Sequence, residues 1–312
     1  MKLIPPFTYF GGKRRVARVV WERFGEVHTY VEPFCGTAAV LLGCPYGPRR
    51  KEIINDLNCY IANFFRAVKA APDEVAEHAD RPKVEADLRA VHRWFAEVFD
   101  FEDFRNKVCS NMDFYDAKVA GLWAWGQSLW VGEGFAQRGS RRKGLANVSN
   151  HQSLNSINKD ACRVPGCIFP CSKTLREYLA CLACRLADTW ILCSDWTVAL
   201  RHACLMRGKH VGIFLDPPYS HSTGRKRNIY DTDEPDIADA VRDWCIDHGN
   251  DPRLRIALCG LEGEHNALED LGWTTYAWTS SGLQNRKQAP TSRRRQERIW
   301  FSPHCLPEGE NA

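Results

Sequence analysis

Two kinds of hydrophobic pattern alternate in the first part of the chain. Residues 29–31 and 52–55 are short runs of residue types that favour β-strands, and each run ends at a polar or glycine-containing turn. After the second run, Asn58 can cap a helix. The apolar positions that follow have helical spacing: Ile61, Phe64, Phe65 and Val68. Two strand–helix units in succession predict an α/β fold with a parallel, doubly wound sheet.

This alternation stops at about residue 67 and resumes at about residue 174. Helical patterns rich in acidic or aromatic residues come first, and residues 131–173 then have little periodicity and many Gly, Ser, Asn and Arg residues. A long irregular segment inside a compact domain favours a binding role. The pattern therefore predicts one sheet domain, 1–66 and 174–312, that is split by an insertion, 67–173.

The C-terminal part completes the predicted sheet. Apolar runs at 190–193, 211–215 and 254–259 predict strands with helices between them. Residues 274–279 and 298–302 can form a closing antiparallel hairpin. The sheet is therefore expected to be mostly parallel.

Composition narrows the class of protein. With 44% hydrophobic and 26% charged residues among 312, the chain has enough apolar surface to form a core, which excludes a disordered protein. No window approaches about 20 uncharged apolar residues, and the first ten residues do not resemble a signal peptide. We expect no membrane contact and a cytoplasmic location.

The 14 cysteines are expected to be reduced thiols, metal ligands or core residues, because no secretory segment is apparent. Cys181 and Cys184 have the spacing of zinc ligands, but they lie within a run of leucines at helical spacing. Small buried thiols are therefore favoured over structural zinc. Zinc bound in the region between Cys162 and Cys193 stays open as an alternative.

Positive charge is concentrated in two segments, although the net charge is only +4. Residues 138–163 and residues 286–298 each carry an excess of five positive charges, whereas residues 231–247 hold seven acidic residues. Such clustering is typical of surfaces that bind a polyanion, and equally of solvated loops.

Four acidic residues follow predicted strands: Glu32, Asp56, Asp195 and Asp216. In an open α/β sheet, ligands bind beyond the carboxyl ends of the strands. These carboxylates can accept hydrogen bonds from the hydroxyls and amines of a nucleoside, and Gly36 allows the backbone to approach it closely.

The sharpest motif is Asp216-Pro217-Pro218-Tyr219, directly after a fully apolar run. Two prolines make the turn rigid, so that the Asp216 carboxylate and the Pro217 carbonyl form a paired acceptor for an exocyclic amine. Tyr219 adds an aromatic face for a planar base.

These motifs together resemble the Dam-like (class alpha) DNA adenine-N6 methyltransferases, which use S-adenosylmethionine. The resemblance covers roughly residues 1–66 and 174–302 and follows the family's order. It rests on Thr8-Tyr9-Phe10-Gly11-Gly12-Lys13, Glu32-Pro33-Phe34-Cys35-Gly36-Thr37-Ala38, Ile54-Asn55-Asp56-Leu57-Asn58, Asp195-Trp196 and Asp216-Pro217-Pro218-Tyr219. It implies a Rossmann-like methyltransferase sheet with an inserted target-recognition domain.

The resemblance also implies roles for individual residues. Asp216, Pro217, Pro218 and Tyr219 would be catalytic, and the cofactor would be bound by Tyr9, Lys13, Phe34, Gly36, Asp56, Asp195, Trp196 and Asp216, with Lys13 near its carboxylate. Two positions depart from the family pattern. Tyr9 replaces the usual Trp, and Ala38 replaces a second glycine, which makes a positive φ unfavourable there.

The expected reaction is direct transfer of the sulfonium methyl group to N6 of an adenine flipped out of duplex DNA. Hydrogen bonds to Asp216 and to the Pro217 carbonyl would favour a pyramidal, nucleophilic nitrogen. No metal is expected in the site, because the leaving group is a neutral thioether.

Double-stranded DNA is the expected partner, a cognate restriction endonuclease is optional, and we expect a monomer or weak dimer. The basic segments predict contacts to DNA phosphates from Arg138, Arg141, Arg142, Lys143, Arg225, Lys226, Arg227, Arg293, Arg294 and Arg295.

Alternatives remain open from sequence alone. The same motif could act on N4 of cytosine in DNA or on N6 of adenine in RNA, because both are exocyclic amines. A non-catalytic, zinc-containing nucleic-acid-binding protein is a second alternative. A protein glutamine methyltransferase is disfavoured for two reasons. The chain has arginine-rich segments, and the motif of those enzymes begins with Asn, whereas the motif here begins with Asp216.

Overall fold

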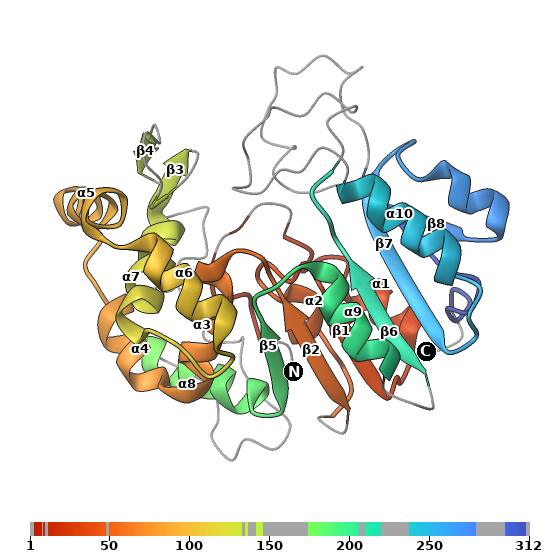
Figure 1. The fold of residues 1–312 in the computed structure, drawn as a ribbon, viewed down its shortest axis with the longest axis horizontal. Helices are drawn as coiled ribbons and strands as arrows, with labels where there is room; N and C mark the ends of the chain where they lie inside the picture. Colours follow the sequence, from red (N-terminus) through yellow and green to blue (C-terminus); the bar gives the residue numbers. More distant parts are fainter. Residues whose placement is uncertain are drawn as a thin grey trace.

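The computed structural model describes residues 3–7, 9, 12–47, 50–132, 135–136, 142–145, 174–205, 210–219, 237–278 and 297–309. Within these residues, seven strands form the central sheet (Figure 1). They are β1 (Thr29–Glu32), β2 (Lys51–Asn55), β5 (Thr189–Leu192), β6 (Val211–Leu215), β7 (Leu254–Leu261), β8 (Thr274–Trp278) and β9 (Glu297–Phe301).

The strand order is β5-β2-β1-β6-β7-β9-β8. Strands β5, β2, β1, β6 and β7 are parallel, whereas β9 is antiparallel to β7 and to β8. The chain steps outward from β1 to β2 and β5, and then returns to β6 on the other side of β1. The carboxyl ends of β1 and β6 therefore flank the point at which strand order reverses, where α/β sheets bind ligands. The predicted mostly parallel sheet and its closing hairpin are confirmed.

Helices cover both faces of the sheet because alternate strand residues point to opposite sides. Val31 and Ile53 pack in the cluster that contains α9 (Trp196–Leu205), α10 (Ile237–His248) and the 3₁₀ helix Asn266–Leu271. Tyr30 and Ile54 pack in the cluster that contains α1 (Ala17–Phe24), α2 (Ala39–Leu42) and α3 (Cys59–Ala70). In Figure 1, α9 and α10 lie in front of the sheet, and α1 and α2 lie behind it.

A helical layer joins the second cluster beside β5 and β2 (Figure 1). The layer packs against α3. The ring of Trp123, from the layer, is stacked on the ring of Tyr60, from α3, at a centroid distance of 5.9 Å. The predicted boundary at residue 66 lies inside α3, which continues to Ala70. The layer contains α4 (Pro72–Ala79), α5 (Glu85–Arg93), a π-helix (Trp94–Val98), α6 (Phe101–Ser110), α7 (Ala117–Leu129) and α8 (Leu175–Leu186), with a small ribbon of β3 (Trp130–Gly132) and β4 (Arg142–Leu145).

No helix in the described ranges is long and apolar enough to cross a bilayer.

The predicted cap of α3 is confirmed, since the Asn58 side chain accepts a hydrogen bond of 3.0 Å from the backbone N–H of Tyr60. Ile61, Phe64, Phe65 and Val68 are buried as predicted.

A buried ion pair attaches α8 to the sheet. The two terminal guanidinium nitrogens of Arg185 donate to the Glu52 carboxylate of β2, at 2.5 and 2.9 Å. The hydroxyl of Thr189 donates to the same carboxylate at 3.0 Å, and Arg50 lies 3.2 Å from it. Because the Glu52 side chain is only 5% exposed, these partners replace the hydrogen bonds that water would give its carboxylate.

We predict that Arg185→Met lowers the free energy of unfolding by about 3 kcal/mol, because it leaves a buried carboxylate short of its main partner. Urea denaturation measures this. Arg176→Met is the matched control on the same helix, since Arg176 pairs with Asp73 at the exposed surface. It should cost less than about 1 kcal/mol. Equal losses in the two variants would contradict the prediction.

Candidate active site

The four predicted strand-end acids meet at one cavity of about 350 Å³. It lies at the carboxyl edge of the sheet, beyond the ends of β1, β2, β5 and β6. The predicted cofactor residues line it together with these acids: Tyr9, Lys13, Glu32, Phe34, Gly36, Asp56, Asp195, Trp196 and Asp216. The structure therefore brings together residues that are up to 207 positions apart in the chain.

The turn after β1 is held by Asp56. One carboxylate oxygen of Asp56 accepts from the backbone N–H of Gly36 at 2.8 Å, and the other accepts from that of Asn58 at 2.9 Å. Gly36 has a φ of 48°, so a side chain there would be strained. The loop after β1 and the loop after β2 are thereby joined at the wall of the cavity.

Ala38 corrects an expectation from the sequence. An alanine at this position was expected to avoid positive φ, but Ala38 has a φ of 52° and lies in the left-handed region just before α2. This conformation costs about 1–2 kcal/mol for a residue with a Cβ. Its N–H donates to the carbonyl of Cys35 at 2.6 Å and its carbonyl accepts from Leu42 at 2.9 Å. The turn keeps its shape without the second glycine because these bonds and burial of the methyl group hold it.

Aromatic side chains form two other parts of the wall. The ring of Tyr9 lies beside the Gly36 turn, where a Cβ on Gly36 would be 3.5 Å from it. The Tyr9 hydroxyl accepts a hydrogen bond of 3.4 Å from the Asn58 amide. The rings of Phe34 and Trp196 are stacked with centroids 6.2 Å apart. The cavity thus has apolar faces between its carboxylates.

Asp195 differs from the other acids because it is exposed. It starts the turn into α9, and its carboxylate accepts from the backbone N–H of Thr197 at 2.9 Å and from the Thr197 hydroxyl. These bonds fix the orientation of the carboxylate and leave it open to the cavity.

A polar network surrounds Asp216. The Lys13 ammonium lies 2.8 Å from the Asp216 carboxylate and 3.8 Å from that of Glu297, and it donates to the Tyr219 hydroxyl at 3.1 Å. The Tyr219 hydroxyl in turn lies 3.2 Å from Glu297. The side chains of Lys13 and Glu297 are 5% and 8% exposed, whereas that of Asp216 is 19% exposed toward the cavity.

Burial and pairing set the charges in this network. Burial lowers the pKa of Lys13, but the nearby Asp216 carboxylate and the other acidic groups outweigh it and hold the pKa well above its ordinary value. Burial raises the pKa of Asp216, and Lys13 partly offsets that effect. Lys13 is therefore a permanent cation that favours the ionised form of Asp216.

Glu32 and Asp56 also have perturbed titration. Burial raises the pKa of Glu32 to about 8, although hydrogen bonds from the Tyr30 hydroxyl and the Leu41 N–H stabilise its charged form. Burial likewise raises the pKa of Asp56 to about 6, against the hydrogen bonds from Asn58 and Gly36. A cluster of shifted carboxyl groups in a cavity is typical of a functional site.

The remaining residues of the predicted catalytic motif lie beside the cavity. Pro218 lines it, Pro217 is buried, and Tyr219 is half-buried with its hydroxyl directed to Lys13 and Glu297.

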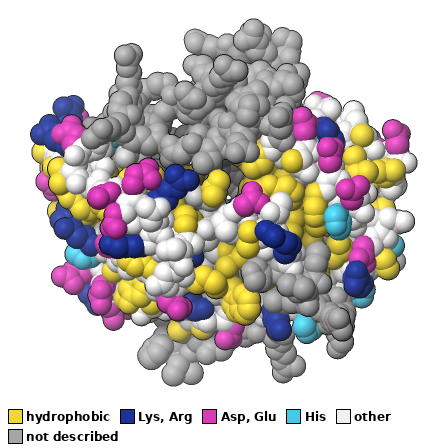
Figure 2. Space-filling view, in the orientation of Figure 1, with side chains coloured by type: hydrophobic (Ala, Val, Ile, Leu, Met, Phe, Trp, Pro, Cys, Tyr) yellow, Lys and Arg dark blue, Asp and Glu magenta, His cyan; other side chains and the backbone are white. Residues whose placement is uncertain are grey.

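All the predicted DNA contacts fall outside the described side chains, although the backbones of Arg142 and Lys143 belong to β4. On the face drawn in Figure 2, the described basic and acidic side chains are interspersed.

Three residues at the site had no local signal in the sequence. Glu297 reaches Lys13 because β9 pairs antiparallel with β7. Phe101 and Arg105 line the cavity from α6, in the segment predicted to be an insertion. Only the paired strands and the packing of α6 against α3 bring these residues to the site.

The predicted zinc spacing at Cys181 and Cys184 lies on helix α8, with Cys181 buried and Cys184 exposed. In a zinc knuckle, the two cysteines lie on a tight turn, whereas here they lie on a regular helix. The other cysteines of that region, Cys162, Cys167 and Cys171, lie outside the described residues.

A mostly parallel sheet with acidic strand ends around one cavity is the architecture of a Rossmann-like fold that binds its ligand at the carboxyl edge of the sheet. Residues 9–244 match the family described as D12 class N6 adenine-specific DNA methyltransferase. The chain belongs to this family, whose activity is adenine-specific methylation of DNA. The predicted family, fold class and adenine-N6 activity are thereby confirmed. A search of curated proteins finds no match to the chain.

We predict that the free energy of unfolding of Glu32→Gln increases relative to that of wild type as pH rises. Folded wild type holds the Glu32 proton up to a pH of about 8, whereas an ordinary glutamate loses it near 4.5. Wild-type stability therefore falls across this window, and Gln has no proton to lose. The free energy of unfolding of the variant relative to wild type should rise by about 2–5 kcal/mol between pH 5 and 8.5.

Urea denaturation at both pH values measures this difference. Glu102→Gln is the control, because Glu102 is an exposed residue of α6. A difference between wild type and Glu32→Gln that does not change with pH would contradict the prediction.

Proposed function

We propose that the protein takes the methyl group from S-adenosylmethionine and transfers it to N6 of an adenine turned out of duplex DNA, with Asp216 contacting the amine. The observation that carries this proposal is the place of Asp216. It follows β6, lines the same cavity as Asp56 and Gly36, and is paired with Lys13. A base inside a duplex cannot enter such a cavity, so the target adenine must leave the stack.

The cavity fits a nucleoside cofactor. Its volume of about 350 Å³ lies within the range of small-molecule sites. The Asp56 carboxylate, oriented by two backbone N–H groups, would accept hydrogen bonds from the ribose hydroxyls. Phe34 and Trp196 offer apolar surface for the adenine ring, and Asp195 an acceptor for its amine. When bound, S-adenosylmethionine supplies a sulfonium methyl group, and the rest of the cofactor leaves as a neutral thioether.

Tyr9 would contact the same cofactor from the side of the Gly36 turn. Its ring packs on that turn and its hydroxyl is held by Asn58, so its position depends on the loops after β1 and β2. A side chain on Gly36 would narrow the space between the Tyr9 ring and the turn. We therefore assign Tyr9 and Gly36 to cofactor binding together.

Asp216 and the Pro217 carbonyl would accept the two N–H groups of the target adenine. This contact draws the nitrogen lone pair out of the ring and makes it nucleophilic where the charge develops. The turn cannot relax away, because Pro217 and Pro218 have fixed φ. Asp216 and Pro218 line the same cavity as the cofactor residues, so this turn borders the space that the cofactor would fill.

For Lys13 we propose a role in addition to the cofactor contact that the family resemblance implies. Its ammonium lies on Asp216 at 2.8 Å, and we propose that it keeps Asp216 ionised and oriented as an acceptor. Glu297 and Tyr219 hold Lys13 from the other side. Lys13 thus acts through Asp216, and contact with the cofactor carboxylate is not required for this function.

We predict that Asp216→Ala reduces methyl transfer by about 10²–10³-fold or more, because the amine loses its acceptor. Cofactor affinity should stay within about tenfold of wild type, since the other cavity residues remain. The assay incubates the protein with radiolabelled S-adenosylmethionine and mixed-sequence duplex DNA, and then identifies the modified nucleoside.

Asp243→Ala is the control, because Asp243 is 67% exposed on α10, where it pairs with Arg242 of the same helix. Wild-type rates in Asp216→Ala would refute the assignment of Asp216. Label on N4 of cytosine would replace adenine as the acceptor base. In a parallel incubation with RNA, more label on RNA than on DNA would replace DNA as the substrate.

We further propose that the basic segments bind DNA phosphates. Replacing Arg141, Arg142 and Lys143 together with Gln should weaken binding to all duplex sequences and reduce the slope of log K against log salt by up to about 3. Fluorescence anisotropy over a range of salt concentrations measures the slope. An unchanged slope would contradict this assignment.

A further inference from the structure

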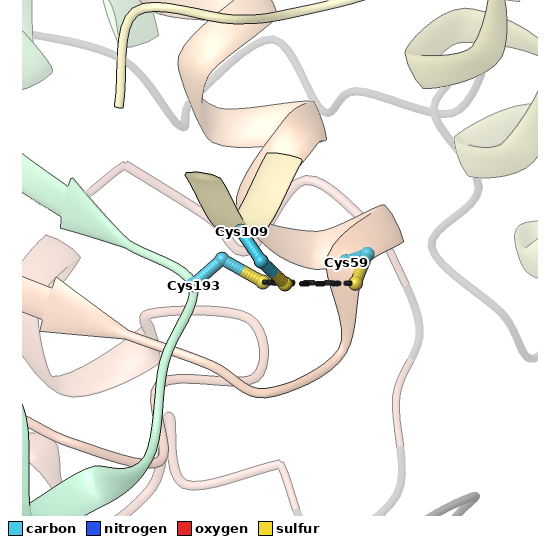
Figure 3. Close-up of side chains that lie close together, drawn as sticks. All are labelled: Cys59, Cys109 and Cys193. Atoms are coloured by element: carbon cyan, nitrogen blue, oxygen red, sulfur yellow. Dashed lines mark hydrogen bonds between the residues drawn. The ribbon is translucent and has the colours of Figure 1, made fainter. Parts of the chain in front are cut away.

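Three cysteine side chains from separate segments meet beside the cavity (Figure 3). Cys59 is the first residue of α3, Cys109 lies on α6, and Cys193 directly follows β5. Their Sγ atoms are 3.9 Å apart for Cys59 and Cys109, 3.8 Å for Cys109 and Cys193, and 3.7 Å for Cys59 and Cys193. The three sulfur atoms therefore form a nearly equilateral triangle.

The triangle has the dimensions of one face of a tetrahedral zinc site. With Zn–S bonds of about 2.3 Å and tetrahedral angles, the sulfur atoms of three ligands lie about 3.8 Å apart. The observed separations lie within 0.1 Å of this value. We propose that Cys59, Cys109 and Cys193 bind one Zn²⁺ ion through three thiolates, with water as the fourth ligand.

The surroundings suit such an ion. Cys59 and Cys193 are buried and Cys109 is exposed, which leaves a route of entry from solvent. The Leu57 carbonyl oxygen lies 3.9 Å from the Sγ atoms of both Cys59 and Cys193, so an oxygen already faces the sulfur atoms. Three thiols release three protons when they bind one Zn²⁺, and the resulting group has a net charge of −1.

Two guanidinium groups offset that negative charge. Arg105 of α6 and Arg66 of α3 both interact electrostatically with the cysteines. Arg66 is buried and is fixed by donating to the carbonyls of Val108 and Asn111, at 2.8 and 3.1 Å. Its position is thus independent of the thiols, and its positive charge lies near the group that zinc and three thiolates would form.

The ion would join three elements at the wall of the cavity. Cys59 itself lines the cavity, and Cys193 lies two positions before Asp195 in the chain. Zinc would thereby fix the start of α3, the end of β5 and helix α6 relative to one another. This role is structural, and it does not rest on methyl transfer or on the proposed cofactor.

Metal binding to the full chain tests the proposal. Protein treated with a chelator and a phosphine reductant is titrated with Co²⁺, whose bonds to thiolates give a charge-transfer absorbance, and the cobalt is then displaced with Zn²⁺. Wild type should bind one equivalent more than Cys109→Ser. Because Cys109 is exposed, this variant should fold, which circular dichroism checks. Its Zn²⁺ affinity at this site should fall by more than about 100-fold.

Cys184→Ser is the matched control, since Cys184 is also an exposed helical cysteine. It should keep the wild-type spectrum, and Zn²⁺ should raise the Tm of wild type and of Cys184→Ser but not that of Cys109→Ser. Comparing variants removes any contribution from the other cysteines of the chain. Identical cobalt spectra for wild type and Cys109→Ser would overturn the proposal. A disulfide between two of the three cysteines in the purified protein, detected by peptide mass, would also overturn it.

Discussion

Negative charge gathered at one edge of the sheet is the constraint to which the rest of the site responds. Parallel strands bring their carboxyl ends together, so Glu32, Asp56 and Asp216 share one cavity. Burial of several carboxylates is unfavourable unless each has a partner. Lys13 supplies the cation for Asp216, backbone N–H groups satisfy Asp56, and Glu32 has a pKa raised to about 8 by burial. Each acid is thus accommodated differently, and the Asp216 and Asp56 carboxyl groups both remain at the wall of the cavity as hydrogen-bond acceptors.

Sequence patterns were sufficient to predict the sheet and the acidic residues that follow its strands, because strand periodicity and turn residues are local signals. Asp216 and Asp56 could be placed for that reason. Glu297 could not, because only the antiparallel pairing of β9 with β7 carries it to Lys13. Ala38 shows the opposite limit. Its intrinsic preference opposes a positive φ, but hydrogen bonds to Cys35 and Leu42 and a buried methyl group impose a φ of 52°.

The helical layer was harder to interpret from sequence because its described apolar side chains share a core with the sheet. Aromatic residues of α7 and α3 stack directly, as Tyr60 and Trp123 show, and one hydrophobic cluster includes both the layer and one face of the sheet. A division at residue 66 marks a change of pattern along the chain, but α3 runs through it to Ala70. Phe101 and Arg105 reach the cavity through this shared packing.

The three cysteines lie where these two parts of the molecule meet. Cys59 and Cys193 belong to segments that leave the sheet, and Cys109 belongs to α6 in the helical layer. No spacing rule connects them, because they are separated by 50 and 84 positions and come together only when α6 packs on α3. The loops after β2 and β5 carry Asp56 and Asp195, so whatever fixes these cysteines also fixes one side of the cavity. The packing of α6 against α3 is therefore coupled to the geometry of the candidate active site.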